Sequence, residues 1–197
     1  MSKTSTKDRI VAVALDLFHE NGINATSVDD ILEVSATGKS QFYYYFKSKE
    51  GLISAVLETF FKFIKSDAAP IDHEINSWED LEEFLNFFVT MNKRFNKPRA
   101  CPLGFIGAEL NPSQTELSMQ VNEIFDYMKL TLKKFFDKAK KDGDFKKNID
   151  SDSLADFCLA ILQGGLMTSK IRKDIKPLKA SIKHALKYLK AIRICTK

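Results

Sequence analysis

The residues best suited to chemistry lie close together, between Thr37 and Lys49. This stretch reads Thr-Gly-Lys-Ser-Gln-Phe-Tyr-Tyr-Tyr-Phe-Lys-Ser-Lys and contains no acidic residue. Hydroxyl, amide and ammonium groups on one helix can donate hydrogen bonds to base edges in the major groove of DNA and to the flanking phosphates. The stretch therefore predicts a helix that reads DNA.

The expected contacts divide between bases and phosphates. Lys39, Ser40 and Gln41 lie near the start of the helix, where a helix-turn-helix presents side chains to base edges. Lys39 can donate to guanine and Gln41 can pair with adenine. Other hydroxyls and lysines are expected to contact the phosphates of the DNA backbone: Thr26 and Ser27 at the start of the preceding helix, and Tyr43, Tyr44, Lys47 and Lys49. Two plainer interpretations remain open, namely tyrosines packed on the domain surface and lysines on a solvated face.

A run of short helices has to position these groups. Apolar residues at helical spacing predict a helix from Thr6, as its cap, to Asn21. A capping box at Ser27 begins a second, short helix. After a tight turn at 35–37, Gly38 can cap a third helix that runs to about Tyr44. Helix, short helix, turn and short helix is the outline of a helix-turn-helix.

The rest of the chain also predicts helices and no strands. Ser48, Ser77 and Ser113 can each cap a further helix, with breaks expected at 68–70 and at 97–98. Pro177 can start the last helix. The sequence thus predicts an all-α fold of about nine helices, with one domain over residues 1–49 and a second over residues 50–197.

Composition excludes several classes of protein. The chain has 197 residues, of which 44% are hydrophobic and 28% charged, as in soluble globular proteins. We find no apolar run of the roughly 18 residues that mark a membrane span. The polar N-terminus has no signal-peptide core, and three distant cysteines fit a reducing compartment. We therefore expect a cytoplasmic protein that does not enter a membrane.

Total charge is a poor guide to the partner. The net charge is +4, but residues 1–49 hold six basic and six acidic groups, whereas residues 170–197 hold ten basic groups and one acidic group. Bulk attraction to phosphates would point to the C-terminal end. The prediction of DNA binding at residues 37–49 therefore rests on local arrangement.

Nothing in the sequence predicts an enzyme, a cofactor or a metal site. The three histidines do not cluster with cysteines or acids at ligand spacing. Glycine-rich phosphate loops and nucleophile elbows are missing from the sequence. An all-helical protein-interaction module is the competing class, but it leaves residues 37–49 unexplained.

Residues 6–57 resemble the DNA-binding domain of TetR-type regulators, with the core Phe-Tyr-Tyr-Tyr-Phe-Lys-Ser-Lys at 42–49. The resemblance implies a homodimeric, ligand-responsive regulator, most often a repressor, on a near-palindromic operator. Tyr45 stands where the family commonly has a histidine that reaches the DNA backbone. Two departures concern the turn: Ala36 replaces a common glycine, and Gly38 replaces a serine or threonine. A non-glycine residue in a left-handed turn is expected to carry strain.

By the same resemblance, the C-terminal domain holds a small, mostly apolar effector and pairs with its copy through the last two helices. The residues expected around the effector are Phe63, Trp78, Phe87, Phe88, Met91, Phe95, Cys101, Phe105, Glu109, Phe125, Met128, Gln163 and Met167. Thr90 and Asn122 are further polar candidates. Core packing is the plainer interpretation for each of them.

Cys101 supports a second interpretation of the regulator. It lies between Arg99-Ala100 and Pro102, at the start of a helix and near basic side chains, which can lower a thiol pKa. The chain could therefore sense oxidants or electrophiles through Cys101. An inert buried thiol is the plainer alternative.

Overall fold

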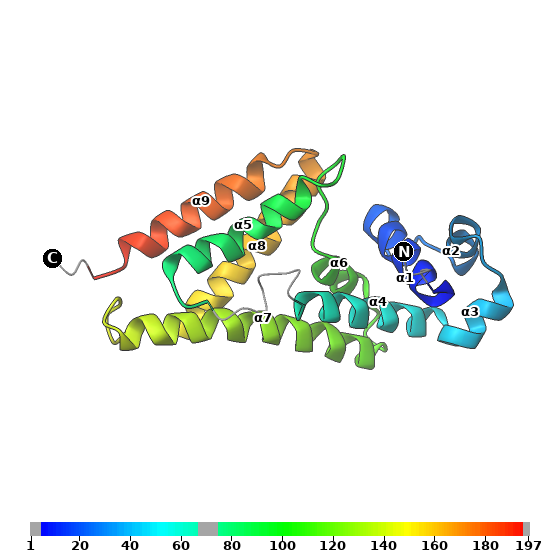
Figure 1. Cartoon of the computed structure of the whole chain (residues 1–197), viewed down its shortest axis with the longest axis horizontal. Coiled ribbons are helices and arrows are strands. Elements are labelled where there is room, and N and C mark those ends of the chain that lie inside the picture. Colours follow the sequence, from blue (N-terminus) through cyan, green and yellow to red (C-terminus); the bar gives the residue numbers. More distant parts are fainter. Residues whose placement is uncertain (1–4, 67–74, 195–197) are drawn as a thin grey trace. The chain divides into compact units, whose positions relative to one another are not determined.

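The protein is all-helical in the part that the computed structural model describes, residues 5–66 and 75–194. Its helices are α1 (Thr6–Asn21), α2 (Val28–Ser35), α3 (Lys39–Phe46), α4 (Lys49–Ile64), α5 (Trp78–Asn92), α6 (Pro102–Glu109), α7 (Thr115–Lys141), α8 (Ser151–Arg172) and α9 (Lys176–Ala191) (Figure 1). The predicted all-α fold of about nine helices is confirmed. The break predicted at 68–70 lies outside the described residues.

Contacts divide the chain into two compact units. The first comprises residues 1–63 and 102–124, and therefore holds α1, α2, α3, nearly all of α4, α6 and the start of α7. The second comprises residues 64–101 and 125–197, with α5, the rest of α7, α8 and α9. One later segment, 102–124, thus belongs with the helix-turn-helix, while the domain boundary at residue 49 stays a prediction.

Helix α1 is the centre of the first unit. It contacts α2, α3 and α6. Its inward stripe is Ile10, Val11, Ala14 and Phe18, none of which is more than 4% exposed. Burial of each large side chain in such a stripe contributes about 1.5–3 kcal/mol. This packing holds α2 and α3 against a common support.

Most of the predicted helix starts are correct. Ser27 and Ser77 each form a capping box with the acid three residues later, Asp30 and Asp80. The hydroxyl of Ser48 accepts a hydrogen bond from the amide of Gly51 at 3.1 Å, as expected of a cap for α4. Gly38 is the N-cap of α3.

Three boundary predictions are wrong. Ser5, rather than Thr6, caps α1, since its hydroxyl accepts from the amide of Asp8 at 3.1 Å. Helix α7 begins at Thr115, so Ser113 is one residue too early to cap it, and its hydroxyl donates to Asn111 instead. Helix α5 ends at Asn92, well before the predicted break at 97–98.

Helices α8 and α9 form a closely packed hairpin in the second unit. A side chain on Gly165 would come within 3.0 Å of Leu178, so only glycine fits this crossing without displacement. The amide of Leu178 donates to the buried hydroxyl of Ser169 at 3.0 Å. By length and composition α8 could cross a membrane, but 44% of that window is buried in the protein, as in a core helix.

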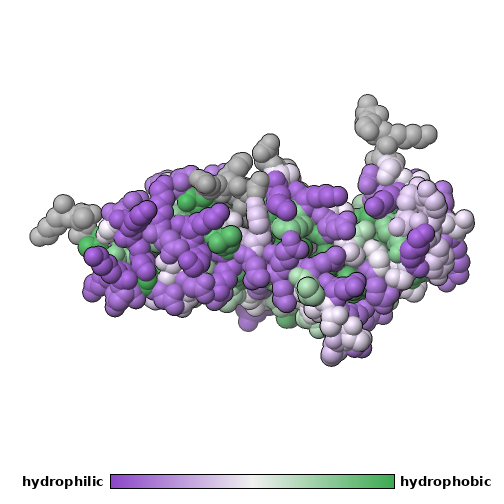
Figure 2. Space-filling model, turned by 90° about the horizontal axis from the view of Figure 1, so that it is seen from below, coloured by the Kyte–Doolittle hydropathy of each residue, from purple (hydrophilic) through white to green (hydrophobic). Residues whose placement is uncertain are grey.

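The molecular face in Figure 2 is mostly hydrophilic, and its hydrophobic side chains are scattered in small groups. Isolated apolar side chains of this kind are normal on a protein surface. This face therefore presents no broad apolar patch.

Candidate nucleic-acid interface

Helix α3 has one buried face and one exposed face. Phe42 and Phe46 are 0% and 4% exposed, and their ring centroids lie 5.5 Å apart. Tyr44, on the opposite face, is 73% exposed. We use the term reading surface for the exposed or half-exposed groups of α3 and its C-terminal end: Lys39, Ser40, Gln41, Tyr43, Tyr44, Tyr45, Lys47 and Lys49. The two phenylalanines hold α3 in place while the reading surface stays accessible.

Lys39 already has a partner in the free protein. Its Nζ lies 3.0 Å from a carboxylate oxygen of Asp29, and both side chains are mostly exposed. The hydrogen bond with Asp29 raises the pKa of Lys39, so the lysine stays charged. Exposed pairs of this kind contribute little to stability. A base or phosphate can therefore replace Asp29 at small cost.

Two hydroxyls at the start of α2 were predicted to bind phosphates, and one of them is exposed. Ser27 is exposed, and its oxygen accepts from the amide of Asp30. Thr26 is only 1% exposed, and its hydroxyl donates to the carbonyl of Gly22 at 2.7 Å. The geometry does not favour the predicted phosphate contact of Thr26, because this side chain closes the α1–α2 loop.

The turn between α2 and α3 is strained in the expected place. Ala36 has φ 49° and ψ 51°, in the left-handed region. The amide of Thr37 donates to the carbonyl of Leu32 at 3.0 Å, and the hydroxyls of Ser35 and Thr37 lie 2.7 Å apart. These hydrogen bonds close the turn around an alanine where glycine would be relaxed.

Replacing Ala36 with glycine is expected to stabilise the protein. The left-handed conformation costs alanine about 1–2 kcal/mol, and the greater freedom of glycine in the unfolded chain offsets about 0.5–1 kcal/mol of the gain. The net increase in the free energy of unfolding should be about 0.5–1 kcal/mol. Urea unfolding measures it, and a decrease would contradict strain at this turn.

The joint between α3 and α4 is unusually tight. Lys47 has φ 64° and ψ −39°, and the amide of Ser48 donates to the carbonyl of Phe46 at 2.7 Å. This is a γ-turn with positive φ, a rare and strained conformation. A Cβ atom on Gly51 would overlap the carbonyl oxygen of Phe46. The absent side chain of Gly51 therefore lets the end of α3 close onto α4, and it sets the direction of Lys47.

The residues predicted around an effector divide between the two units. The first unit holds Phe63, Phe105, Glu109 and Asn122, and the second unit holds the others. Glu109 is engaged, since its carboxylate accepts from the backbone amide of Asn24 at 3.0 Å. Its predicted contact with an effector is therefore not supported by the geometry, because the carboxylate is directed to the α1–α2 loop.

Trp78 takes part in a structural cluster in the second unit. Its Nε1 donates to Asp144 at 2.9 Å, and the guanidinium of Arg193 lies 4.4 Å from its ring centroid and 3.1 Å from Asp144. The hydrogen bond from Trp78, followed by that from Arg193, lowers the pKa of Asp144. Trp78 thus ties the start of α5 to the C-terminal end of the chain, an interaction that explains its position without an effector.

The other predicted effector residues of the second unit differ in exposure. Met128 is 1% exposed and is a core residue. Phe95 is 36% exposed and packs under Arg99, whose guanidinium lies 4.1 Å from the ring centroid. The half-buried candidates are Phe87, Phe88, Met91, Phe125, Gln163 and Met167. Half-buried side chains from α5, α7 and α8 are therefore the remaining candidates within this unit.

The two described cysteines are buried. Cys101 is 5% exposed, and Cys158 is 0% exposed with a pKa raised to about 12 by burial. A thiol that senses oxidants needs access and thiolate character. Cys158 lacks both, and the burial of Cys101 does not favour the thiol-sensor interpretation.

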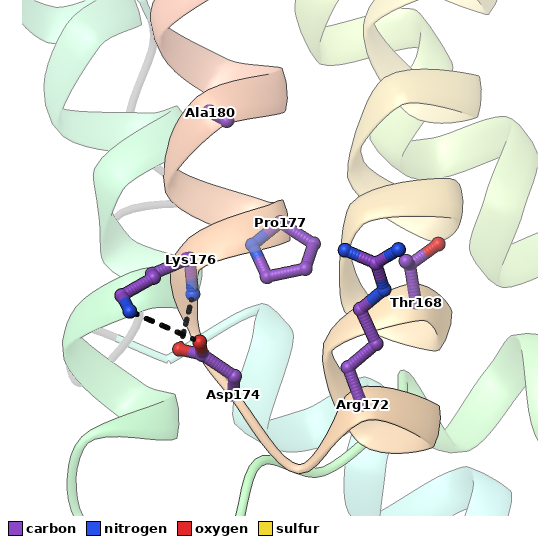
Figure 3. Close-up of a pocket in the computed structure, with 6 residues that line it drawn as sticks. All are labelled: Thr168, Arg172, Asp174, Lys176, Pro177 and Ala180. Carbon is purple, nitrogen blue, oxygen red and sulfur yellow. Dashed lines mark hydrogen bonds and ion pairs between the residues drawn. The ribbon is translucent and has the colours of Figure 1, made fainter.

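A hollow of about 680 Å³ lies at the turn between α8 and α9 (Figure 3). It is lined by Thr168, Arg172, Asp174, Lys176, Pro177 and Ala180. Asp174 accepts from the amide of Lys176 at 3.0 Å. None of the predicted effector residues lines this hollow, which is open to solvent.

Two family models match the chain. The model described as "Bacterial regulatory proteins, tetR family" matches residues 10–56, and "Tetracyclin repressor-like, C-terminal domain" matches residues 78–185. Together they match residues of both compact units.

Similar proteins and structures agree with these matches. The HTH-type transcriptional repressor DhaR of Mycobacterium sp. (strain GP1) is 25% identical over 178 residues, which cover 90% of this chain and 89% of DhaR. The regulatory protein TetR from Rhodobacter sphaeroides has a similar fold, with a TM-score of 0.83, 20% identity and coverage of 93% and 98%. A cysteine mutant of the TetR family regulator CifR, bound to a 26-base-pair operator DNA, has a TM-score of 0.77, 20% identity and coverage of 95% and 98%.

Proposed function

Because the chain belongs to the TetR family of bacterial regulatory proteins and is a DNA-binding transcriptional regulator, we propose that it is a cytoplasmic, homodimeric repressor. Its operator is a near-palindrome, and a small, mostly apolar molecule releases it. One observation supports the DNA contacts above all. The groups of α3 that can bond to bases and phosphates lie opposite the buried Phe42 and Phe46, and Tyr44 is 73% exposed.

The bases are read from the start of α3. Ser40 and Gln41 are exposed there, and Lys39 is held only by an exposed ion pair. Tyr44, Lys47 and the hydroxyl of Ser27 bind phosphates on either side of the groove. Since residues 1–49 have no net charge, specific hydrogen bonds rather than bulk attraction set the affinity.

The homodimer forms through α8 and α9. Both helices expose small residues and isolated large ones, including Gly164, Ala180, Ile171 and Tyr188. Ile171 is 72% exposed, and a side chain on Gly164 would meet no atom within 4 Å. Small residues let two helix pairs approach closely, and a two-fold dimer matches a near-palindromic site.

The effector binds among the half-buried side chains of the second unit. Gln163 supports an effector with a hydrogen-bond acceptor, because its Nε2 is buried without a hydrogen-bond partner among the described residues. An unsatisfied buried donor costs about 1–3 kcal/mol, which an acceptor on a ligand would remove. The bound form places the two reading surfaces at the wrong spacing, which draws the population off DNA.

Selection of bound duplexes from a random pool tests this function. We expect the purified protein to enrich a near-palindrome whose half-sites are separated by about 34–36 Å, one turn of DNA. Binding should weaken strongly with salt, because several phosphates are contacted. A single enriched half-site would contradict the dimer. No enrichment at moderate salt would contradict specific DNA binding and favour an all-helical interaction module.

A further inference from the structure

The loop between α1 and α2 is bonded to the end of α6. The backbone amide of Asn24 donates to Glu109 Oε2 at 3.0 Å, and Asn24 Nδ2 donates to the backbone carbonyl of Glu109, also at 3.0 Å. The two residues are 85 positions apart in the chain. The loop is therefore held at both the main chain and the side chain of one residue.

Gly22 makes this contact possible. It is the C-cap of α1 with φ 94°, and a Cβ atom there would overlap the carboxylate of Glu109. The carbonyl of Gly22 accepts the hydroxyl proton of Thr26 at 2.7 Å. Glu109 and Thr26 thus hold the same loop from two sides, just before Ser27 begins α2.

Helix α6 is the first element of the segment 102–124 of the first unit. The chain passes from the second unit into the first between Cys101 and Pro102, and α6 begins at that point. Its last residue is Glu109. The end of α6 is therefore bonded to the α1–α2 loop through Glu109, in addition to the contacts that α6 makes with α1.

We propose that Glu109 is a positioning residue for DNA binding. Its hydrogen bonds with Asn24 fix the α1–α2 loop, and through this loop the N-terminus of α2 and the helices that α1 supports. Glu109 itself touches no DNA. This role rests on DNA binding as the function of the chain, and it lies outside the helix-turn-helix sequence.

The direction in which operator affinity changes distinguishes the positioning role of Glu109 from a purely electrostatic effect of its charge. Removing a negative charge should strengthen attraction to DNA. We expect the opposite for Glu109→Ala, an operator affinity lower by about tenfold, since each half-site loses a charge-assisted hydrogen bond. Glu109→Gln should retain affinity within about threefold, because its amide oxygen can still accept from Asn24.

The experiment compares these two variants with the wild type and with Glu123→Ala, which removes an exposed carboxylate from the same unit. Affinity for the selected operator is measured over a range of salt. The salt dependence of Glu109→Ala should match that of the wild type, since no phosphate contact is lost. Amide hydrogen exchange should become faster at residues 22–27 in Glu109→Ala only.

Several results would overturn the role of Glu109. These are equal affinities of Glu109→Ala and Glu123→Ala, equal losses in Glu109→Ala and Glu109→Gln, and faster exchange throughout the protein. Failure of the wild type to select any operator would instead overturn DNA binding. The two failures are therefore distinguishable.

Discussion

Gly51→Ala is expected to abolish high-affinity operator binding. The added Cβ would overlap the carbonyl oxygen of Phe46, which is backbone and cannot rotate away. The end of α3 must then move from α4, and with it Lys47 and the reading surface. Loss of even one good base contact per half-site, at about 1–3 kcal/mol each, would lower affinity by roughly 30-fold or more in a dimer.

The same substitution should also lower the free energy of unfolding by about 1–3 kcal/mol, as overpacking does. Operator affinity and urea unfolding measured on the same preparation separate misplacement of α3 from global unfolding. Lys147→Ala, which truncates an exposed side chain in the second unit, is the control and should keep the wild-type affinity. An exposed substitution of this kind should change the free energy of unfolding by no more than about 0.5 kcal/mol. Wild-type operator affinity in Gly51→Ala would refute the proposal that the tight joint between α3 and α4 positions the reading surface.

The double variant Tyr44→Ala, Lys47→Ala should weaken operator binding with little change in stability. Both side chains are exposed, so their removal leaves the packing of Phe42 and Phe46 intact. A dimer loses four phosphate contacts, each contributing about 0.5–1.5 kcal/mol, so the affinity should fall by roughly 30-fold or more. The slope of log K against log salt should become smaller by about 1.8, since two lysines no longer displace counterions.

Lys147→Ala is the control for this variant. Lys147 is an exposed lysine that belongs to the second unit and not to the helix-turn-helix. It should leave both the affinity and the salt slope nearly unchanged. An unchanged slope in the double variant would show that Lys47 does not contact a phosphate, and an unchanged affinity would refute both assignments.

Local features of the fold were predictable from the sequence. The capping boxes at Ser27 and Ser77 depend on side chains three residues apart, so their residue types suffice to identify them. The strain at Ala36 was predictable from the family resemblance, since an alanine stands where the family commonly has glycine. The error at Thr6 arose because two neighbouring hydroxyl residues, Ser5 and Thr6, compete to cap one helix, whereas Ser113 donates its hydroxyl to Asn111 in the turn before α7.

Contacts between distant segments were not predictable in this way. Glu109 is polar enough to bind an effector, but its carboxylate accepts a hydrogen bond from Asn24. Trp78 is large enough to line a pocket, but its indole donates a hydrogen bond to Asp144. The sequence hinted only weakly at a packing constraint at Gly51, because glycine in the first turn of a helix is unfavourable unless packing requires it. Only the position of Phe46 supplies that reason.

The sequence by itself determined the helical fold, the helix-turn-helix and the family of this protein, because these depend on periodicity and on side chains within a few positions of each other. The tertiary structure decided which groups are available. It buried the hydroxyl of Thr26, paired Lys39 with Asp29, and joined Glu109 to a loop 85 residues away. Availability depends on the burial and hydrogen-bond partners of each group, and these are set when distant segments pack together.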